Sequence, residues 1–127
     1  MGSKGIAASA ILVALLLVDA KVVDAMAAST RVEYSSSQYL KNFALSACIA
    51  QAYKSDEVVK DSRAAADGYL QLGSFPYEAH EEAASLARKF LAKEYQSYSG
   101  AKLVLMKCID LFNSKELDRL AKKYFRK

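Results

Sequence analysis

Apolar residues recur at helical spacing along most of the chain, and this periodicity constrains the fold more than any other feature. One early stripe follows the i, i+3, i+4, i+7, i+8 pattern of a single helix face and comprises Leu40, Phe43, Ala44, Ala47 and Cys48. A later stripe with the same spacing comprises Ala83, Leu86, Ala87, Phe90 and Leu91. Residues 28–127 contain 15 Ala and only seven β-branched residues, which favours helix over strand. The sequence therefore predicts an all-α fold.

Capping and turn residues divide this region into about five helices joined by short turns, a compact bundle. Serine and asparagine cap helix starts, acidic residues suit a first turn, and glycine suits a helix end. In chain order, the boundary signals are the serines at 35–37, Ser55, Gly73, Pro76 and the Asn113–Ser114 pair. Five turn-prone or polar residues at 96–100 separate the third helix from a fourth over about 102–112.

The inward faces of the other helices follow from the same spacing. The second helix has a weaker stripe of Val58, Ala65, Tyr69 and Leu72, with Ser62 and Arg63 near its centre. The fourth has Leu105, Cys108, Ile109 and Phe112. The fifth has Leu117, Leu120, Ala121, Tyr124 and Phe125.

An uncharged run of 14 residues, 5–18, stands near the beginning of the chain, after Lys4 and before the small-residue sequence DAMAA at 24–28. This layout is typical of a secretory signal peptide. As a helix the run would span about 21 Å, less than the roughly 30 Å core of a bilayer, which makes a membrane anchor the weaker interpretation. We predict a signal peptide over residues 1–27 and one domain over 28–127. An uncleaved amphipathic helix is the alternative.

Export changes the interpretation of the two cysteines, because thiols in an oxidising compartment tend to pair. Cys48 and Cys108 both remain after the predicted cleavage, and each lies on an apolar stripe. A disulfide between two helices is therefore predicted. The alternative is two reduced cysteines that act as small buried hydrophobic side chains.

Patterns that carry catalysis are missing from the sequence. His80 is the only histidine, and residue 84 is Ala where a zinc-protease helix has its second histidine. We expect His80 to be solvated on a charged helix face. The acidic group Glu78, Glu81 and Glu82 is explained by the preference of carboxylates for a first helical turn. An enzyme is therefore disfavoured, and no cofactor or metal site is predicted.

The formal net charge is +4, from 18 Lys plus Arg against 14 Asp plus Glu. A basic cluster near the end comprises Lys122, Lys123, Arg126 and Lys127. With acidic residues interspersed, we expect this cluster to solvate and cap the last helix rather than to bind nucleic acid or lipid.

The chain has eight Tyr and no Trp. Tyrosine is favoured at interfaces because it combines a large area with few rotors and a polar tip. Tyr77, Tyr95 and Tyr98 flank the third helix or lie in its exit loop, so we predict a binding domain. A helical carrier, with tyrosines lining a cavity for a small apolar ligand, is the alternative. A cell-envelope enzyme that uses the acidic group is a third possibility.

Three runs carry a family resemblance: YLKNFALSACIA at 39–50, AAADGYL at 64–70 and MKCIDLFNSKEL at 106–117. In this order behind a signal peptide, they resemble the fourth family of type VI secretion amidase immunity proteins. The resemblance covers nearly all of residues 28–127 and includes both cysteines.

The resemblance implies a periplasmic homodimer that protects a bacterium from an injected, cysteine-dependent peptidoglycan amidase. This enzyme cleaves between D-glutamate and diaminopimelate. A protruding loop of the immunity protein occupies the catalytic groove, and helices of the partner subunit add contacts elsewhere. The matching effector-binding residues are Gln96, Ser97, Tyr98, Ser99, Gly100, Ala101 and Lys102. Lys93 and Lys102 beside the loop are expected to steer an acidic groove.

Overall fold

A computed structural model describes residues 31–125, and the predicted signal peptide at 1–27 lies outside this part of the chain. The chain divides into two units, Met1–Glu33 and Tyr34–Lys127, and the second holds every described helix. The helices are α2 (Ser36–Ala52), α3 (Asp56–Leu72), α4 (Tyr77–Leu91), α5 (Val104–Phe112) and α6 (Lys115–Phe125). No strand occurs within residues 31–125. The prediction of an all-α bundle of about five helices is confirmed.

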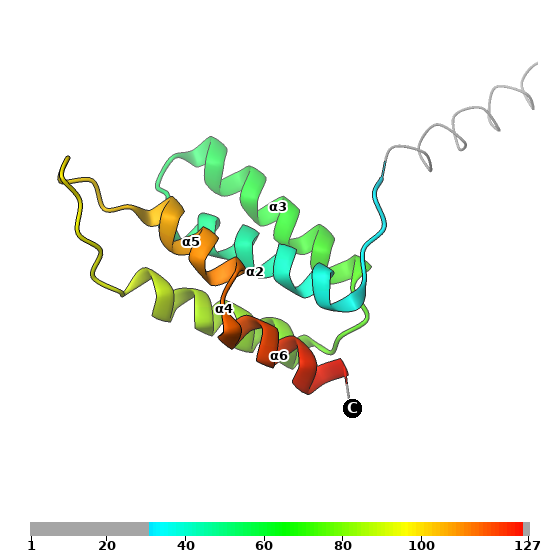
Figure 1. Ribbon diagram of the computed structural model, residues 1–127. Coiled ribbons are helices and arrows are strands. Elements are labelled where there is room, and N and C mark those ends of the chain that lie inside the picture. Colours follow the sequence, from blue (N-terminus) through cyan, green and yellow to red (C-terminus); the bar gives the residue numbers. More distant parts are fainter. Residues whose placement is uncertain (1–30, 126–127) are drawn as a thin grey trace, which may run out of the picture. The chain divides into compact units, whose positions relative to one another are not determined.

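Helix α2 is the central element, because it packs against α3, α4, α5 and α6 (Figure 1). The side chains that are 1% exposed or less come from α2, α4, α5 and α6; they are Leu40, Ala44, Cys48, Ala79, Ala83, Ala87, Cys108, Leu111 and Leu117. Three of them are alanines at every fourth position of α4. Such a row of small side chains lets two helices approach closely. None of the helices in residues 31–125 is long and apolar enough to span a bilayer.

Two of the predicted caps are present as hydrogen bonds. The Ser35 hydroxyl accepts a bond of 3.2 Å from the backbone N–H of Gln38 at the start of α2. Ser114 does the same for the N–H of Leu117 at 3.1 Å, and its own hydroxyl donates to the carbonyl of Leu111. Ser114 therefore joins the end of α5 to the start of α6.

Gly73 follows the last residue of α3, as predicted, but for a different physical reason. Its φ of −77° and ψ of 158° are extended, so the left-handed conformation of a typical glycine cap is not used. A Cβ at this position would lie 3.1 Å from the carbonyl oxygen of Tyr69 and 3.4 Å from Cβ of Tyr39. Glycine is favoured here because a side chain would crowd the carbonyl of Tyr69 at the end of α3.

The predicted inward faces of α3 and α5 are only partly correct, because Tyr69 packs against the core and Cys108 is buried but most of the other predicted residues are not. On α3 the buried residues are Ser62 and Ala66, one position away from the predicted stripe, and the Ser62 hydroxyl donates to the carbonyl of Val58. On α5 the buried residues are Lys107, Cys108 and Leu111. The apolar residues expected to lie inward on α5 are instead exposed or half-buried: Leu105, Ile109 and Phe112.

Candidate functional site

The connection between α4 and α5 is the longest one within residues 31–125 and projects from one end of the bundle (Figure 1). It runs over residues 92–103, so it is longer at both ends than the loop predicted from the turn-prone residues. We call residues 92–103 the α4–α5 loop. All seven predicted effector-binding residues lie in it: Gln96, Ser97, Tyr98, Ser99, Gly100, Ala101 and Lys102.

Short-range hydrogen bonds shape the tip of the α4–α5 loop. The hydroxyls of Ser97 and Ser99 lie 3.0 Å apart, and the Ser97 hydroxyl accepts a bond from the N–H of Ser99. The N–H of Gly100 donates to the carbonyl of Ser97 across a turn. Gly100 has a φ of +75°, a conformation that glycine adopts without the steric cost of a Cβ. The tip is therefore a defined turn rather than a strand or helix.

Tyr98 stands at this turn with its side chain fully exposed to solvent. A solvent-exposed aromatic side chain on a projecting turn is well suited to enter a pocket of another molecule. Lys102 is also exposed, whereas the Nζ of Lys93 lies over the ring of Phe90, 3.6 Å from its centroid. Both lysines were predicted to steer the amidase groove. In the described part of the chain, an aromatic ring lies beside the Nζ of Lys93 but not beside that of Lys102.

Three contacts at the base of the loop were not anticipated from the sequence. The Nζ of Lys107 donates a bond of 3.1 Å to the carbonyl of Leu91, the last residue of α4. The hydroxyl of Tyr95 donates to Oδ2 of Asp110 at 2.6 Å, and this bond raises the pKa of Tyr95. Lys107 also faces the ring of Tyr95 at 5.5 Å. The sequence pattern gave no signal for these contacts, because it assigns a lysine beside the stripe of Cys108 to solvent.

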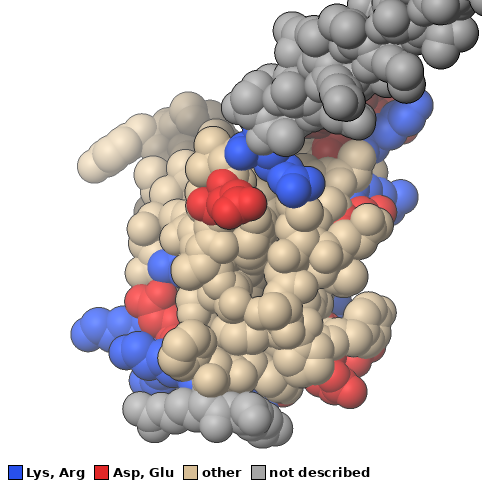
Figure 2. Space-filling model, turned by 90° about the vertical axis from the view of Figure 1, so that its right-hand side faces the viewer, with Lys and Arg blue, Asp and Glu red and all other residues tan. Residues whose placement is uncertain are grey.

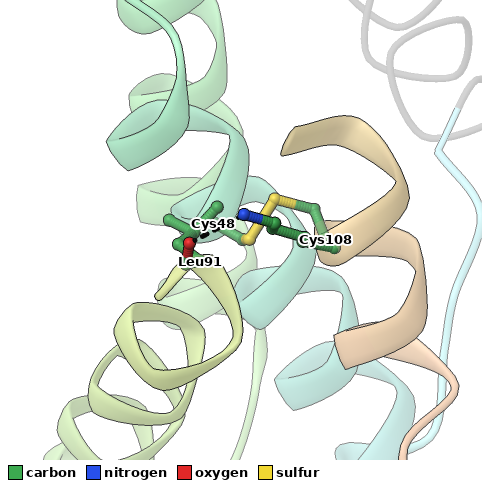
Figure 3. Close-up of a disulfide and its surroundings, with 4 residues drawn as sticks. Cys48, Leu91 and Cys108 are labelled. Carbon is green, nitrogen blue, oxygen red and sulfur yellow. Dashed lines mark hydrogen bonds between the residues drawn. A yellow bond between two sulfur atoms is a disulfide. The ribbon is translucent and has the colours of Figure 1, made fainter. Parts of the chain in front are cut away.

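The predicted disulfide is confirmed and lies beside this base. Cys48 of α2 and Cys108 of α5 are completely buried, with an Sγ–Sγ distance of 2.08 Å and a Cα–Cα distance of 5.6 Å. Figure 3 shows the bond close to the carbonyl of Leu91 and to the hydrogen bond that this carbonyl accepts. The helix that follows the loop is thus covalently attached to the central helix.

The outer face of α5 carries an apolar patch next to the loop. Leu105, Met106 and Ile109 are 48%, 49% and 46% exposed. Contiguous exposed apolar surface is a mark of sites where proteins associate. The sequence did not indicate this surface, because Leu105 and Ile109 lie on the stripe that was predicted to face the core.

The His80 prediction is wrong, since this residue is 2% exposed rather than solvated. Its Nδ1 lies 3.1 Å from the carbonyl oxygen of Pro76, and its ring packs edge-on against Phe43. Glu82 of the acidic group accepts bonds from the Nζ of Lys123 and from the hydroxyl of Tyr124, and the latter bond raises the pKa of Tyr124. Both residues therefore have structural roles in joining α4 to its neighbours.

The described residues offer no group of three His, Cys, Asp or Glu side chains placed to hold a metal ion. A groove between α4 and α6 is open to solvent and has five charged residues in its lining: Glu82, Lys89, Glu116, Arg119 and Lys123. Figure 2 shows the end of the bundle opposite the α4–α5 loop, where Lys and Arg stand beside Asp and Glu on a largely uncharged face. In this view the described Lys and Arg side chains are interspersed with Asp and Glu, so this face shows no continuous basic surface of the kind that binds nucleic acid.

Comparison with known proteins gives a consistent result. The family described as Tai4, type VI secretion system (T6SS) amidase immunity protein, matches residues 38–121. A chain in the structure of the Tae4/Tai4 effector–immunity system from Salmonella typhimurium is 40% identical. It has a TM-score of 0.67, and the match covers 71% of this chain and 89% of that chain.

Two further structures are similar. A chain from a study of new type VI-secreted toxins and self-resistance proteins in Serratia marcescens is 28% identical, with a TM-score of 0.66 over 72% of this chain and 76% of that one. At 22% identity, a chain in the complex of Tae4 from Salmonella typhimurium with Tai4 from Enterobacter cloacae shares the fold, with a TM-score of 0.65 over 73% and 99%. No curated protein matches the chain significantly.

Proposed function

The chain belongs to the Tai4 family of type VI secretion system amidase immunity proteins, and we propose that it inhibits a Tae4 amidase by inserting the α4–α5 loop into the catalytic groove. The family consists of immunity proteins that bind an effector, not of enzymes. The target reaction is cleavage of the D-glutamate to diaminopimelate bond in peptidoglycan by a catalytic cysteine. Occupation of the groove excludes this substrate and so protects the producing bacterium from its siblings.

The observation that carries the proposal is a projecting turn with a fully exposed Tyr98, held on a hydrogen-bonded base. The residues beside Tyr98 are small, so the backbone is accessible to a narrow groove, and peptide groups that are not bonded within the turn can form the hydrogen bonds that a bound peptide would form. The loop contains no D-glutamate to diaminopimelate bond, so the amidase has nothing to cleave. A few buried anchor residues supply most of the affinity in such interfaces.

The compartment is part of the same proposal. A signal peptide over residues 1–27 would deliver residues 28–127 to the periplasm, where the amidase reaches its substrate. The buried bond between Cys48 and Cys108 supports this location, because disulfides form and persist in oxidising compartments. Homodimerisation also belongs to the proposal. The half-exposed apolar side chains of α5 support association with another protein.

A carrier of small apolar ligands finds less support. Such a function calls for a mostly apolar pocket that encloses its ligand. The groove between α4 and α6 is open and charged, and a second groove is lined partly by Asp67, Glu81 and Arg88. Apolar side chains gather instead on the outside of α5.

The test uses the Salmonella typhimurium Tae4 amidase, which also forms a complex with Tai4 from another species. Bacteria that express this amidase in the periplasm should lyse, and co-expression of the full chain should prevent lysis. The double variant Ser99→Tyr/Gly100→Val should not protect, because bulky side chains fill the turn. Helix content and the sedimentation coefficient of a dimer should be unchanged.

Gly68→Val is the matched control, because it adds the same side chain where a Cβ meets no atom within 4 Å. This variant should protect as well as the unmodified chain does. Full protection by Ser99→Tyr/Gly100→Val would exclude loop insertion. Lysis in the presence of the unmodified chain would exclude inhibition of this amidase altogether.

A further inference from the structure

The last carbonyl of helix α4, that of Leu91, is bound by a side chain from another helix. In a continued helix, the carbonyl of Leu91 would accept a bond from the N–H of Tyr95. Here it accepts one from the Nζ of Lys107 at 3.1 Å, and a positive charge at a helix C-terminus is favoured by the helix dipole. Lys107 is 8% exposed, so this contact is shielded from water. The first end of the loop is thus attached to α5.

A second contact attaches the chain to α5 at Tyr95, four residues after Leu91. The Tyr95 hydroxyl donates to Asp110 at 2.6 Å, and the Tyr95 ring faces Lys107. Lys107 and Asp110 are three residues apart on α5, so they lie on neighbouring turns. Both residues flank Cys108, which is bonded to the central helix. The segment that enters the loop is therefore held against the most firmly anchored part of α5.

The other end of the loop is restricted by its own backbone. Leu103 precedes α5 with a φ of 53° and a ψ of 35°, the left-handed region. A bulky residue rarely adopts this conformation, which persists only where the surroundings enforce it. Both ends of the loop are consequently constrained, while its tip carries the exposed Tyr98.

We propose that Tyr95, Lys107 and Asp110 are positioning residues that hold the entering segment of the α4–α5 loop on α5, so that its tip meets the amidase already ordered. The inference rests on the proposed function, since it concerns the same loop. Ordering a loop on binding costs conformational entropy, and a loop that is ordered beforehand avoids this cost. The three residues act through the loop and need not touch the amidase.

The experiment measures the Kd of the Salmonella typhimurium Tae4 amidase, by titration calorimetry, for protein expressed from the full chain. Tyr95→Phe and Asp110→Ala should each weaken binding about 3- to 10-fold, the range expected for one net hydrogen bond. The double variant should bind no more weakly than either single one, because both remove the same bond. Asp110→Asn retains an acceptor oxygen and should restore most of the affinity. Lys107→Met extends the test to the bond with Leu91.

A second readout separates positioning from general stability. In Tyr95→Phe, nitrogen relaxation of the Gly100 amide should show a larger amplitude of motion, while the melting temperature should fall no further than it does in Tyr124→Phe. The matched control is Tyr124→Phe, which removes an equally short hydroxyl bond to a carboxylate, that of Glu82, between α4 and α6. Its affinity and the Gly100 relaxation should be unchanged.

The outcomes separate this inference from the proposed function. Unchanged affinity in Tyr95→Phe and Asp110→Ala, together with lost affinity in Ser99→Tyr/Gly100→Val, would overturn the positioning role alone. Unchanged affinity in all these variants would overturn loop insertion as well. An equal loss in Tyr124→Phe would also overturn the positioning role, because any lost tyrosine bond would then have the same effect.

Discussion

At the scale of single residues, Leu103 shows that the loop geometry is imposed by its surroundings. Its left-handed backbone costs a non-glycine residue about 1 to 2 kcal/mol. Nothing in the sequence marks the position, since leucine is an ordinary helix former. The conformation becomes understandable only with the loop in place, because α5 must start immediately after a chain that returns from the projecting turn.

The strain at Leu103 can be measured by comparing two truncations of its side chain. Leu103→Gly and Leu103→Ala lose nearly the same contacts, but only glycine tolerates a φ of 53°. The glycine variant should therefore be more stable than the alanine variant by about 1 kcal/mol in urea unfolding. Leu105→Gly and Leu105→Ala, inside α5, provide the control, where alanine should be the more stable. The same order of stability at both positions would contradict strain at Leu103.

The hydrogen bonds of two tyrosine hydroxyls lead to a prediction of how folding stability depends on pH. Hydrogen bonds to carboxylates raise the pKa of Tyr95 and of Tyr124 in the folded protein. The folded state therefore favours the protonated phenols. The stabilisation from these bonds is fully present below the ordinary tyrosine pKa of about 10, and it is lost as the pH rises through the pKa values of the folded protein.

Melting temperatures recorded across the alkaline range should therefore fall as the phenols ionise. In the double variant Tyr95→Phe/Tyr124→Phe the decline should be shallower, because neither phenol remains to ionise. Near neutral pH the two proteins should both be folded, which makes the comparison valid. A decline of the same steepness in both would show that these hydrogen bonds do not control alkaline stability.

At the scale of elements, α5 presents a different face to the core from the one its apolar pattern indicates. Cys108 points inward, as predicted. Its burial is compatible with two faces of the helix, one that includes Ile109 and one that includes Lys107 and Leu111. The structure selects the face with Lys107 and Leu111, because Lys107 binds the end of α4. Since periodicity counts a lysine as polar, it assigns that face to solvent and Ile109 to the core.

Truncation of two α5 side chains tests this orientation. Leu111→Ala should cost about 2 to 5 kcal/mol, because Leu111 is completely buried and the change leaves a cavity. Ile109→Ala should cost less than about 1 kcal/mol in the free protein, since its side chain is half exposed. Chemical denaturation of both variants measures the difference. The reverse ranking would mean that α5 is rotated toward the face predicted from the sequence.

At the scale of the whole molecule, one covalent bond joins parts of the chain that are 60 residues apart. It links the central helix to the helix that follows the loop. Closing a loop of this length stabilises a fold by at most roughly 4 kcal/mol in the chain-entropy treatment. Total stabilities of small domains are about 5 to 15 kcal/mol, so the disulfide is a major contribution.

Removal of the disulfide should therefore lower the melting temperature markedly. A loss of 1 kcal/mol shifts the midpoint of a domain of this size by about 4 to 8 °C. Calorimetry of Cys48→Ser/Cys108→Ser under oxidising conditions should show a shift of more than about 8 °C, and reductant should have no effect on this variant. Reductant should lower the midpoint of the unmodified protein. Equal midpoints with and without reductant would show that the bond does not stabilise the fold.

The sequence alone determined the features that depend on residues close together in the chain. Helix periodicity, the caps at Ser35 and Ser114 and the turn-prone residues of the loop are local, because each rests on neighbours within about two helical turns. The disulfide was predicted as well, because a signal peptide implies an oxidising compartment and both cysteines lie on apolar stripes. These features were enough to indicate five helices and a loop between the third and the fourth, whereas a binding role for this loop was expected from the family resemblance.

Tertiary structure decided everything that depends on which distant residues meet. It buried His80, turned Lys107 inward and joined Tyr95 to Asp110, because polar side chains can be buried where a partner satisfies them. An apolar stripe indicates that a helix has an inner face. Which residues form that face depends on the helices that pack against it. The ordered base of the α4–α5 loop is therefore a property of the assembled bundle and could not be derived from the sequence pattern.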